Sequence, residues 1–366
     1  MGAADRRERA RGELSARNWA GVLATPSVNF TYLTGATVER TERLMCLGLP
    51  RSGEPWLVCP SFEADRMSEL APGVRIVPWQ ETEDPFRVAV GEIVAHAGTW
   101  ALEPTTTYHD ATRIAAAAPG LWLADGADLF EKIRRAKDAE EIAALRRAID
   151  AAWEVYDAIV AGLAEGVSGE EVARAMTAEF ASRGYEAWSL VQFGPSGALP
   201  HGEPGERRLE HGMAVLIDWG GWAGGFTADL TRTLWWDGGV VPAGDAPEEF
   251  RRVFRTVRAA QAAGLAAVGP GAICGDVDRA ARSVIEEAGW GELFTHRLGH
   301  GLGREIHEAP YLVSGSTVAL APGDVVTVEP GIYLPGKFGV RWEDDVLVTE
   351  DGVDNLSRRQ GEETIP

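Results

Sequence analysis

Two acidic residues separated by a run of glycines stand near the middle of the chain, in a pattern suited to chemistry. Asp218 follows the apolar run 214–217, which predicts a buried strand, and Asp229 lies eleven residues further on. Buried carboxylates held close together repel each other unless a cation lies between them, so a divalent metal ion is one interpretation. A hairpin with two solvated acids is the other. The glycines that predict the chain reversal are Gly220, Gly221, Gly224 and Gly225.

Further acidic residues in the second half of the chain favour the metal interpretation. Glu329 follows the apolar run 325–328 and Glu343 lies just before the run 346–348, where an unpaired carboxylate would be costly. Four carboxylates and one histidine form an oxygen-rich ligand set, whose charge matches two divalent ions that share a water molecule. Such ligands favour Mn²⁺, Co²⁺, Fe²⁺ or Zn²⁺. The histidines in nearby glycine-containing segments are His201, His296, His300 and His307.

The composition of the chain argues against several other classes of protein. The 366 residues carry a formal net charge of −20, which disfavours nucleic acid as a partner because affinity for it depends on neutralising phosphates. No apolar run approaches the ~18 residues of a membrane span, and the first residues lack the apolar core of a signal peptide. Three scattered cysteines are typical of a reducing compartment, so we expect a cytoplasmic protein.

The elements that must position these residues differ between the two halves of the chain. Up to about residue 125, short helical and strand-like segments alternate, as in an α/β fold. The charged, alanine-rich segment 128–163 predicts one long amphipathic helix, with a domain junction near residues 126–138. We therefore predict an N-terminal domain over residues 1–130 and a C-terminal domain over 131–366. The C-terminal elements expected are a helix from Ser168, a strand at 188–193, helices at 247–267 and 275–288, and β structure beyond.

Four motifs of the second half together resemble those of a known enzyme family. They occur within residues 185–350 in the order PHGE, DWGGWAGGFTADLTRT, HRLGHGLGREIHEAP and VEPGIYLPGKFGVRWEDD. With these motifs the chain resembles the creatinase/aminopeptidase-P/prolidase family of metallopeptidases, M24. The resemblance implies an α/β, creatinase-like N-terminal domain and an α+β catalytic domain of the pita-bread fold. It also implies a homodimer.

The same resemblance implies a role for each candidate residue. Asp229 and Glu343 would bridge two divalent ions, with Mn²⁺ preferred and Co²⁺, Zn²⁺ or Fe²⁺ as alternatives. Glu329 would also accept a proton from the nucleophilic water. The implied metal ligands are Asp218, Asp229, His300, Glu329 and Glu343. The other implied site residues are the outer histidines His201 and His307, the substrate-pocket histidine His296 and the bracing Arg341, for which a surface ion pair is the alternative.

The activity implied by the resemblance is hydrolysis of Xaa–Pro bonds in dipeptides or short peptides, by attack of a metal-bridging hydroxide on the carbonyl carbon. The short chain favours a dipeptidase (prolidase). However, segment 308–328 lacks the arginine with which some prolidases pair the dipeptide carboxylate, so an Xaa-Pro aminopeptidase stays open. The complete ligand set disfavours two further alternatives, a creatinase-like C–N hydrolase and a catalytically silent peptide-binding module.

Overall fold

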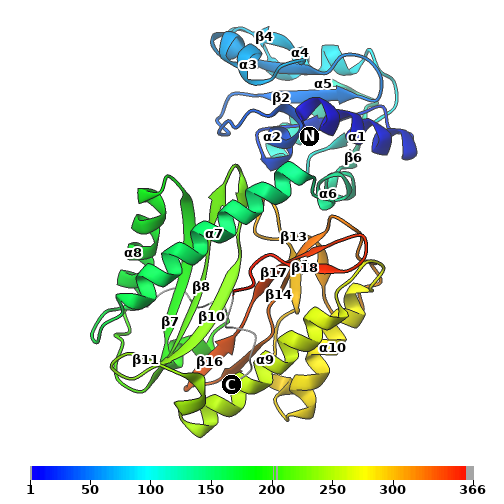
Figure 1. Ribbon diagram of the computed structural model, residues 1–366. Helices are drawn as coiled ribbons and strands as arrows, with labels where there is room; N and C mark the ends of the chain where they lie inside the picture. Colours follow the sequence, from blue (N-terminus) through cyan, green and yellow to red (C-terminus); the bar gives the residue numbers. More distant parts are fainter. Residues whose placement is uncertain (1, 201, 203–204, 360–366) are drawn as a thin grey trace. The chain divides into compact units, whose positions relative to one another are not determined.

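The computed structural model describes residues 2–200, 202 and 205–359. The chain forms two compact units, Met1–Arg134 and Arg135–Pro366. Figure 1 shows both units and labels many of their helices and strands. Among the described residues of either unit, no helix combines the length and the apolar character needed to cross a membrane.

The first unit is built on one mixed β-sheet with the strand order β4-β3-β2-β1-β5-β6. Strand β2 runs antiparallel to β1 and β3, and the other neighbouring pairs are parallel. The strands are β1 (Gly21–Ala24), β2 (Cys46–Pro50), β3 (Trp56–Pro60), β4 (Arg75–Trp79), β5 (Thr99–Leu102) and β6 (Trp122–Asp125). The helices are α1 (Ala3–Ala16), α2 (Val28–Thr34), α3 (Ala64–Leu70), α4 (Pro85–Ile93), α5 (Tyr108–Ala117) and α6 (Ala127–Arg135), with a short 3₁₀ turn at Ser61–Glu63.

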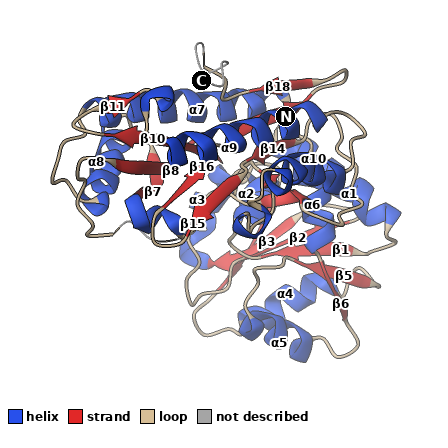
Figure 2. Cartoon of the chain, turned by 90° about the horizontal axis from the view of Figure 1, so that it is seen from below, coloured by secondary structure: helices blue, strands red, loops and turns tan. Residues whose placement is uncertain are grey.

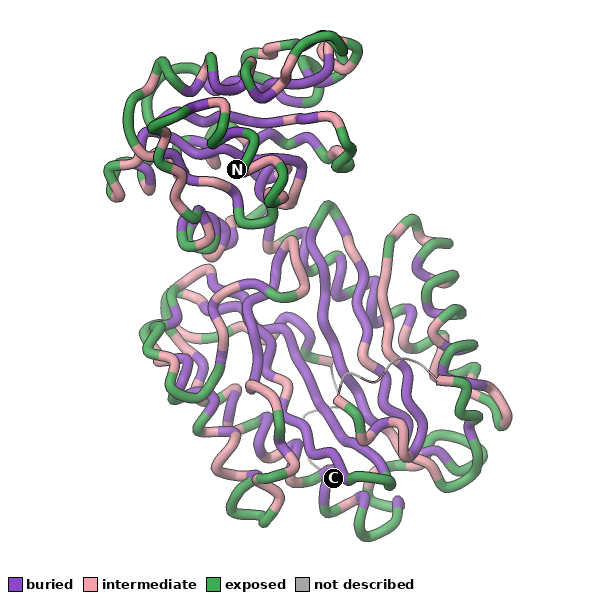
Figure 3. The backbone as a smooth tube through the Cα atoms, turned by 180° about the vertical axis from the view of Figure 1, so that it is seen from behind, coloured by how far each residue is buried: buried purple, intermediate pink, exposed green. Residues whose placement is uncertain are grey.

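Helices cover both faces of this sheet. Val22 and Ala24 of β1 pack with residues of α1, α2, α3 and α6, whereas Leu23 packs on the opposite face with α4 and α5. Figure 2 shows α4 and α5 on one side of the strands and α1 and α2 on the other. Alternate residues of a strand point to opposite faces, so a strand covered on both sides is buried throughout, as Figure 3 shows for the central strands. The predicted α/β organisation is confirmed.

The predicted long helix is divided into two helices. Helix α6 ends at Arg135, and α7 (Ala139–Ala161) begins after Asp138. The Asp138 carboxylate accepts hydrogen bonds from the backbone N–H groups of Glu140 and Glu141 at 2.9 and 3.0 Å. The Glu141 side chain accepts one from the Asp138 N–H at 3.1 Å. This reciprocal cap starts a new helix, which explains why the apolar periodicity does not continue as one element.

The second unit contains two larger sheets and a separate hairpin. The first sheet has the order β11-β10-β8-β7 with β9 beside β8, the second has the order β13-β12-β14-β17-β18, and β15 pairs with β16. The strands of the first sheet are β7 (Glu186–Phe193), β8 (Met213–Ala223), β9 (Phe226–Thr227), β10 (Leu230–Trp236) and β11 (Val240–Val241). The other strands are β12 (Gly299–Gly301), β13 (Glu308–Leu312), β14 (Val325–Val328), β15 (Gly331–Leu334), β16 (Phe338–Arg341), β17 (Asp344–Val348) and β18 (Val353–Asn355).

Each sheet of the second unit is covered by a pair of helices (Figure 1). Helices α7 and α8 (Gly169–Ser182) pack on the first sheet, and α9 (Glu248–Ala267) and α10 (Cys274–Glu287) pack on the second. Helix α8 begins after Ser168 through the predicted capping box. Short 3₁₀ turns lie at Gly194–Ala198, Ala243–Asp245 and Gly291–Leu293.

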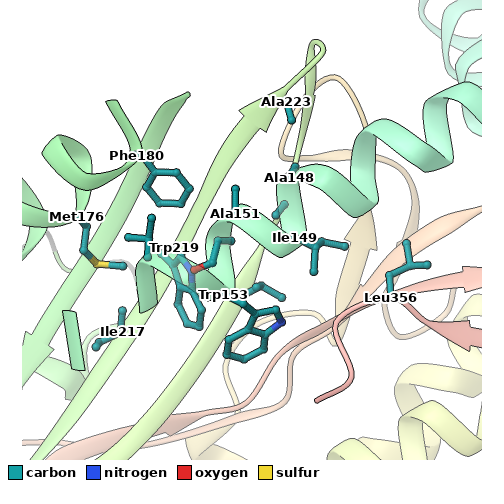
Figure 4. Packing of buried hydrophobic residues seen from close by; sticks show 14 of the residues in the cluster. Ala148, Ile149, Ala151, Trp153, Met176, Phe180, Ile217, Trp219, Ala223 and Leu356 are labelled. Atoms are coloured by element: carbon teal, nitrogen blue, oxygen red, sulfur yellow. The ribbon is translucent and has the colours of Figure 1, made fainter. Parts of the chain in front are cut away.

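Aromatic packing under α7 determines which way β8 faces. The Trp219 ring stacks on Tyr156 with ring centres 4.5 Å apart, and its Nε1 donates to the Ala152 carbonyl oxygen at 2.8 Å. Figure 4 shows Trp219 among the buried side chains beneath this helix. Because neighbouring residues of a strand alternate, Asp218 points to the face that the helices leave uncovered.

The glycine-rich reversal is shorter than predicted. Only Gly224 and Gly225 have the positive φ angles of a turn, 60° and 78°. Gly220 and Gly221 lie inside β8, where a Cβ atom on Gly220 would stand 1.9 Å from the Ala228 carbonyl oxygen. These two glycines therefore permit a close approach of the returning chain, which brings Asp229 beside β8.

Candidate active site

The predicted site residues converge on one cavity of about 700 Å³ in the second unit. Its lining includes all of them except His201, which lies outside the described residues. Ser189 and Arg297 also line the cavity, and aromatic and aliphatic side chains from β7 and from the loop before β13 form an apolar part of its wall: Trp188, Leu190 and Ile306. Residues far apart in sequence thus form one polar pocket with an apolar wall.

A direct contact between the two sheets holds Glu343 beside the β8–β10 hairpin. Thr231 of β10 pairs with Asp218 in the strand register and forms an isolated bridge with Glu343. The Thr231 hydroxyl donates to Glu343 Oε2 at 2.6 Å. Asp229 is fixed from the same side, since its N–H donates to Asp345 Oδ2 at 3.1 Å. Strand pairing and these hydrogen bonds thus bring three carboxylates together: Asp218 on β8, Asp229 between β9 and β10, and Glu343 between β16 and β17.

His300 lies on β12 with a defined ring orientation. Its Nδ1 lies 3.0 Å from the Gly301 carbonyl oxygen, which can only accept, so Nδ1 carries the proton. The other ring nitrogen, Nε2, then presents its lone pair 3.5 Å from Asp229 Oδ2 and 3.3 Å from Glu329 Oε1. An imidazole oriented by its second nitrogen in this way is typical of a metal ligand.

Gly299 and Gly301, on either side of this histidine, leave no room for side chains. A Cβ atom on Gly299 would lie 2.0 Å from the Thr327 carbonyl oxygen, and one on Gly301 would lie 2.4 Å from that of Ala309. Both neighbours are backbone atoms of the flanking chain and cannot rotate away. The glycines are therefore required for β12 to fit between β13 and β14.

We expect Gly299→Ala to lower the free energy of unfolding by about 1–3 kcal/mol or more, because the added methyl group forces the strands apart. Urea unfolding followed by circular dichroism measures this change. Gly269→Ala is the matched control, since nothing lies within 4 Å of a Cβ atom at Gly269. Equal stabilities of the two variants would contradict the packing described for β12.

Three overlapping sets of ligand atoms lie within the cavity, each with its atoms within 4.8 Å of one another. The sets are Asp218, Asp229 and Glu343; His300, Glu329 and Glu343; and Asp229, His300 and His307. Asp218 Oδ1 is also buried without a hydrogen-bond partner among the described residues. An orphaned carboxylate oxygen within an oxygen-rich set of this kind fits divalent cations.

The electrostatics of the carboxylates show the same need for positive charge. Burial, together with the charges of Glu343 and Asp218, raises the pKa of Asp229 well above its usual range. Burial and the charges of Glu329 and Asp218 do the same to the pKa of Glu343. Burial opposes ionisation of Glu329 too, but the hydrogen bond that His300 donates when its ring is protonated, together with the charge of protonated His296, outweighs burial and lowers the pKa of Glu329 to about 2. Bound cations would relieve the remaining repulsion.

Arg341 forms a buried network rather than the alternative surface ion pair. It is only 3% exposed, and its guanidinium is ion-paired with Asp218. Its Nη1 also donates to the Tyr333 hydroxyl at 2.9 Å and to the Pro200 carbonyl oxygen at 3.2 Å. The Tyr333 oxygen lies 2.9 Å from Nε2 of His296. Arg341, Tyr333 and His296 are therefore linked along one side of the site.

Tyr333, Thr231 and Asp345 are site residues that the sequence did not single out. Each lies on a strand and acquires its contact from another segment of the chain. The partner is Arg341 for Tyr333, Glu343 for Thr231 and the Asp229 N–H for Asp345. Burial raises the pKa of Tyr333 to about 12, so its hydroxyl stays protonated at neutral pH. The signal that could have identified Asp345 is the unusual run of three acids, 343–345, at the start of a buried strand.

His307 lies at the exposed side of the cavity. Its ring centre is 4.3 Å from that of His300, and the two rings are nearly perpendicular. The next residue, Glu308, is buried and pairs with Lys137, whose Nζ lies 3.2 Å from Glu308 Oε2. Glu308 Oε1 accepts the N–H groups of Arg304 and Glu305 at 2.9 and 3.0 Å. This ion pair therefore fixes the loop that carries His307.

Lys137 is the cation of this buried pair, and its replacement is expected to destabilise the fold. We expect Lys137→Met to lower the free energy of unfolding by about 3–5 kcal/mol, since the Glu308 carboxylate stays buried after losing its counter-charge. Urea unfolding measures the change. Lys337→Met is the control, because Lys337 pairs with Glu249 in an exposed position where the loss is below about 1 kcal/mol. A similarly small loss for Lys137→Met would contradict the role of the buried pair.

Comparisons with known proteins agree with this fold. The sequence matches metallopeptidase family M24 over residues 143–350 and the creatinase/prolidase N-terminal domain over residues 6–136. It is 35% identical over 343 residues to the Mycobacterium tuberculosis protein named "Probable dipeptidase PepE", covering 91% of this chain and 88% of that protein. Two solved structures are similar throughout their length. Prolidase from Thermococcus sibiricus has a TM-score of 0.89 at 31% identity, with 99% of this chain and 98% of that chain covered. Xaa-Pro dipeptidase from Bacillus anthracis has a TM-score of 0.89 at 29% identity, with 99% of each chain covered.

The fold and the pocket together define a two-domain metallopeptidase, with a creatinase-like first unit and a pita-bread second unit. The chain belongs to metallopeptidase family M24. The predicted family and fold class are thereby confirmed.

Proposed function

We propose that the chain is a dinuclear metal-dependent Xaa-Pro dipeptidase with Mn²⁺ as its preferred ion and Co²⁺, Zn²⁺ or Fe²⁺ as alternatives. The observation that carries the proposal is the convergence of four largely buried carboxylates and the His300 Nε2 lone pair on one cavity. Oxygen-rich ligands with a single imidazole suit these ions. The names of the similar proteins, dipeptidase and prolidase, support the choice of reaction.

The overlap of the ligand sets supports an assignment of ligand roles. Asp229, Glu343 and His300 each belong to two sets. Only the two carboxylates have a pair of oxygens with which to bridge, so we assign the bridging positions to Asp229 and Glu343. Asp218 completes one metal position, and His300 with Glu329 completes the other. Two ions held in this way would lower the pKa of a bound water and polarise the scissile carbonyl group.

The remaining polar residues would act on the substrate. We assign to Glu329 the acceptance of a proton from the attacking water, and to His307 a hydrogen bond to the oxyanion as it forms. His201 is assigned the same oxyanion role from the sequence, outside the described residues. His296 and Arg341 would shape the pocket through Tyr333. The apolar wall of Trp188, Leu190 and Ile306 offers a surface for the proline ring or the side chain before it.

An Xaa-Pro aminopeptidase acting on longer peptides is the second candidate. The observation that favours it is the absence of arginine from segment 308–328. A creatinase-like C–N hydrolase and a silent binding module are disfavoured, since the complete set of ligand residues lines the cavity. A homodimer and a cytoplasmic location complete the proposal; the buried, free cysteines Cys46, Cys59 and Cys274 fit a reducing compartment.

Release of proline from Ala-Pro and Leu-Pro, with the tripeptide Ala-Pro-Ala for comparison, tests the proposal. We expect both dipeptides to be cleaved after loading with Mn²⁺, Co²⁺ or Zn²⁺, and cleavage to stop with chelator. Cleavage of the first bond of the tripeptide at a comparable rate would favour the aminopeptidase. If protein loaded with ions cleaves none of the three peptides, the proposed function is wrong.

A further inference from the structure

The charge of the cavity raises a specific difficulty for a dipeptide substrate. Asp218, Asp229, Glu329 and Glu343 line the cavity, and an Xaa-Pro dipeptide brings a free carboxylate close to them. A carboxylate in a partly desolvated pocket needs a cation as a partner. The dipeptidase function proposed above therefore requires a positive group beyond the metal ligands, and the inference below rests on that function.

Two arginines are among the described residues that line the cavity, Arg341 and Arg297. Arg341 is already engaged by Asp218, by the Tyr333 hydroxyl, by the Thr231 hydroxyl at 3.0 Å and by the Pro200 carbonyl oxygen. It is also buried, so turning toward a ligand would break contacts that hold the site together. Arg341 is thus not the cation that receives the substrate carboxylate.

Arg297 is available for that task. Its guanidinium lies over the Tyr311 ring, 4.6 Å from the ring centre, and among the described residues it makes no ion pair and no side-chain hydrogen bond. The side chain is half-buried. A planar guanidinium held against an aromatic face keeps its N–H edge free for a carboxylate.

The backbone on both sides of Arg297 is anchored. The carbonyl oxygen of Arg297 accepts a hydrogen bond from His296 Nδ1 at 2.7 Å. The N–H of the next residue, Leu298, donates to Asp278 Oδ1 at 3.1 Å, and the Leu298 side chain is fully buried. Arg297 therefore projects from a fixed point next to the pocket histidine and two residues before β12, the strand that carries His300.

We infer that Arg297 binds the free carboxylate of the dipeptide and thereby sets the preference for dipeptides. Segment 308–328 has no arginine, but it supplies Tyr311, the ring on which the Arg297 guanidinium rests. The arginine that pairs with the dipeptide carboxylate thus comes from the segment before β12 rather than from the segment after His307. A longer peptide has a neutral amide at the corresponding position and gains no ion pair from this contact.

Steady-state kinetics with Ala-Pro and its neutral analogue Ala-Pro amide test the inference on the full-length, Mn²⁺-loaded protein. For Arg297→Ala we expect KM for Ala-Pro to rise about ten- to a hundredfold, because a charge-assisted hydrogen bond to the carboxylate is lost. KM for Ala-Pro amide should change less than about threefold in Arg297→Ala. In Arg297→Lys, KM for Ala-Pro should return part of the way to that of the unmodified protein. The control is Arg304→Ala, since Arg304 lies over the Phe226 ring at 4.5 Å but does not line the cavity.

Four outcomes overturn the inference, and a fifth overturns the proposed function on which it rests. Equal treatment of Ala-Pro and its amide by the unmodified protein would show that the carboxylate is not bound. An equal rise in KM for both substrates in Arg297→Ala would show a structural effect instead. The same would follow if Arg304→Ala changed the discrimination between Ala-Pro and its amide as much as Arg297→Ala does. Failure of the unmodified protein to cleave Ala-Pro would overturn the proposed function itself, whereas cleavage without dependence on Arg297 would overturn this inference alone.

Discussion

Asp229→Ala is expected to abolish metal loading and to reduce hydrolysis of Ala-Pro to the level of chelated protein. Asp229 contributes to two of the three ligand sets, so its removal weakens both metal positions at once. Ion content by mass spectrometry and proline release from the same sample measure the two effects. Asp237→Ala is the control, because Asp237 is an exposed aspartate that pairs with His211 at 2.8 Å.

A second substitution at Asp229 distinguishes the loss of bound ions from the loss of folding. Asp229→Asn removes one of the mutually repelling carboxylates while keeping the shape of the side chain. We therefore expect metal-free Asp229→Asn to melt at or above the temperature of the metal-free parent protein. Retention of two ions and normal turnover by Asp229→Ala would contradict the bridging role, and a fall in the melting temperature of Asp229→Asn would contradict the electrostatic description of the site.

His307→Ala is expected to keep the bound ions and to lose about 10²–10⁴-fold in kcat, the usual contribution of a residue that hydrogen-bonds or protonates the reacting group. Its side chain is exposed, so the folded protein loses little stability. Turnover at saturating Mn²⁺, with ion content measured in parallel, tests this. His211→Ala serves as the control because His211 is an exposed histidine that does not line the cavity. Normal turnover in His307→Ala would rule out its action on the substrate.

The sequence predicts the ligand-bearing strands well because their signals are local. Asp218 directly follows the apolar run 214–217, and Glu329 directly follows the run 325–328. A carboxylate at the end of a buried strand is a costly arrangement that needs an explanation, and a metal site provides one. The order of the four motifs then relates these residues to one another before any contact is known.

Contacts that depend on pairing between distant strands could not be predicted in the same way. Tyr333 lies in the apolar segment 331–334, which is typical of a buried strand, and only the β15–β16 pairing brings it to Arg341. Gly220 looks like a turn residue in the sequence, yet it lies inside β8 because the returning chain approaches at Ala228. In the sequence the helical spacing of apolar residues continues across Asp138, although the capping box at that residue begins a separate helix.

The most direct test of the dinuclear site is to strip the protein with chelator and reload it with Mn²⁺ in steps. Ion content and Ala-Pro hydrolysis are measured on the same samples. We predict that hydrolysis is lost when the ions are removed, returns on reloading and reaches its maximum at two ions per chain. Full hydrolysis by protein from which the ions have been removed would contradict the metal-dependent mechanism. Maximal hydrolysis at a single ion per chain would contradict the dinuclear site.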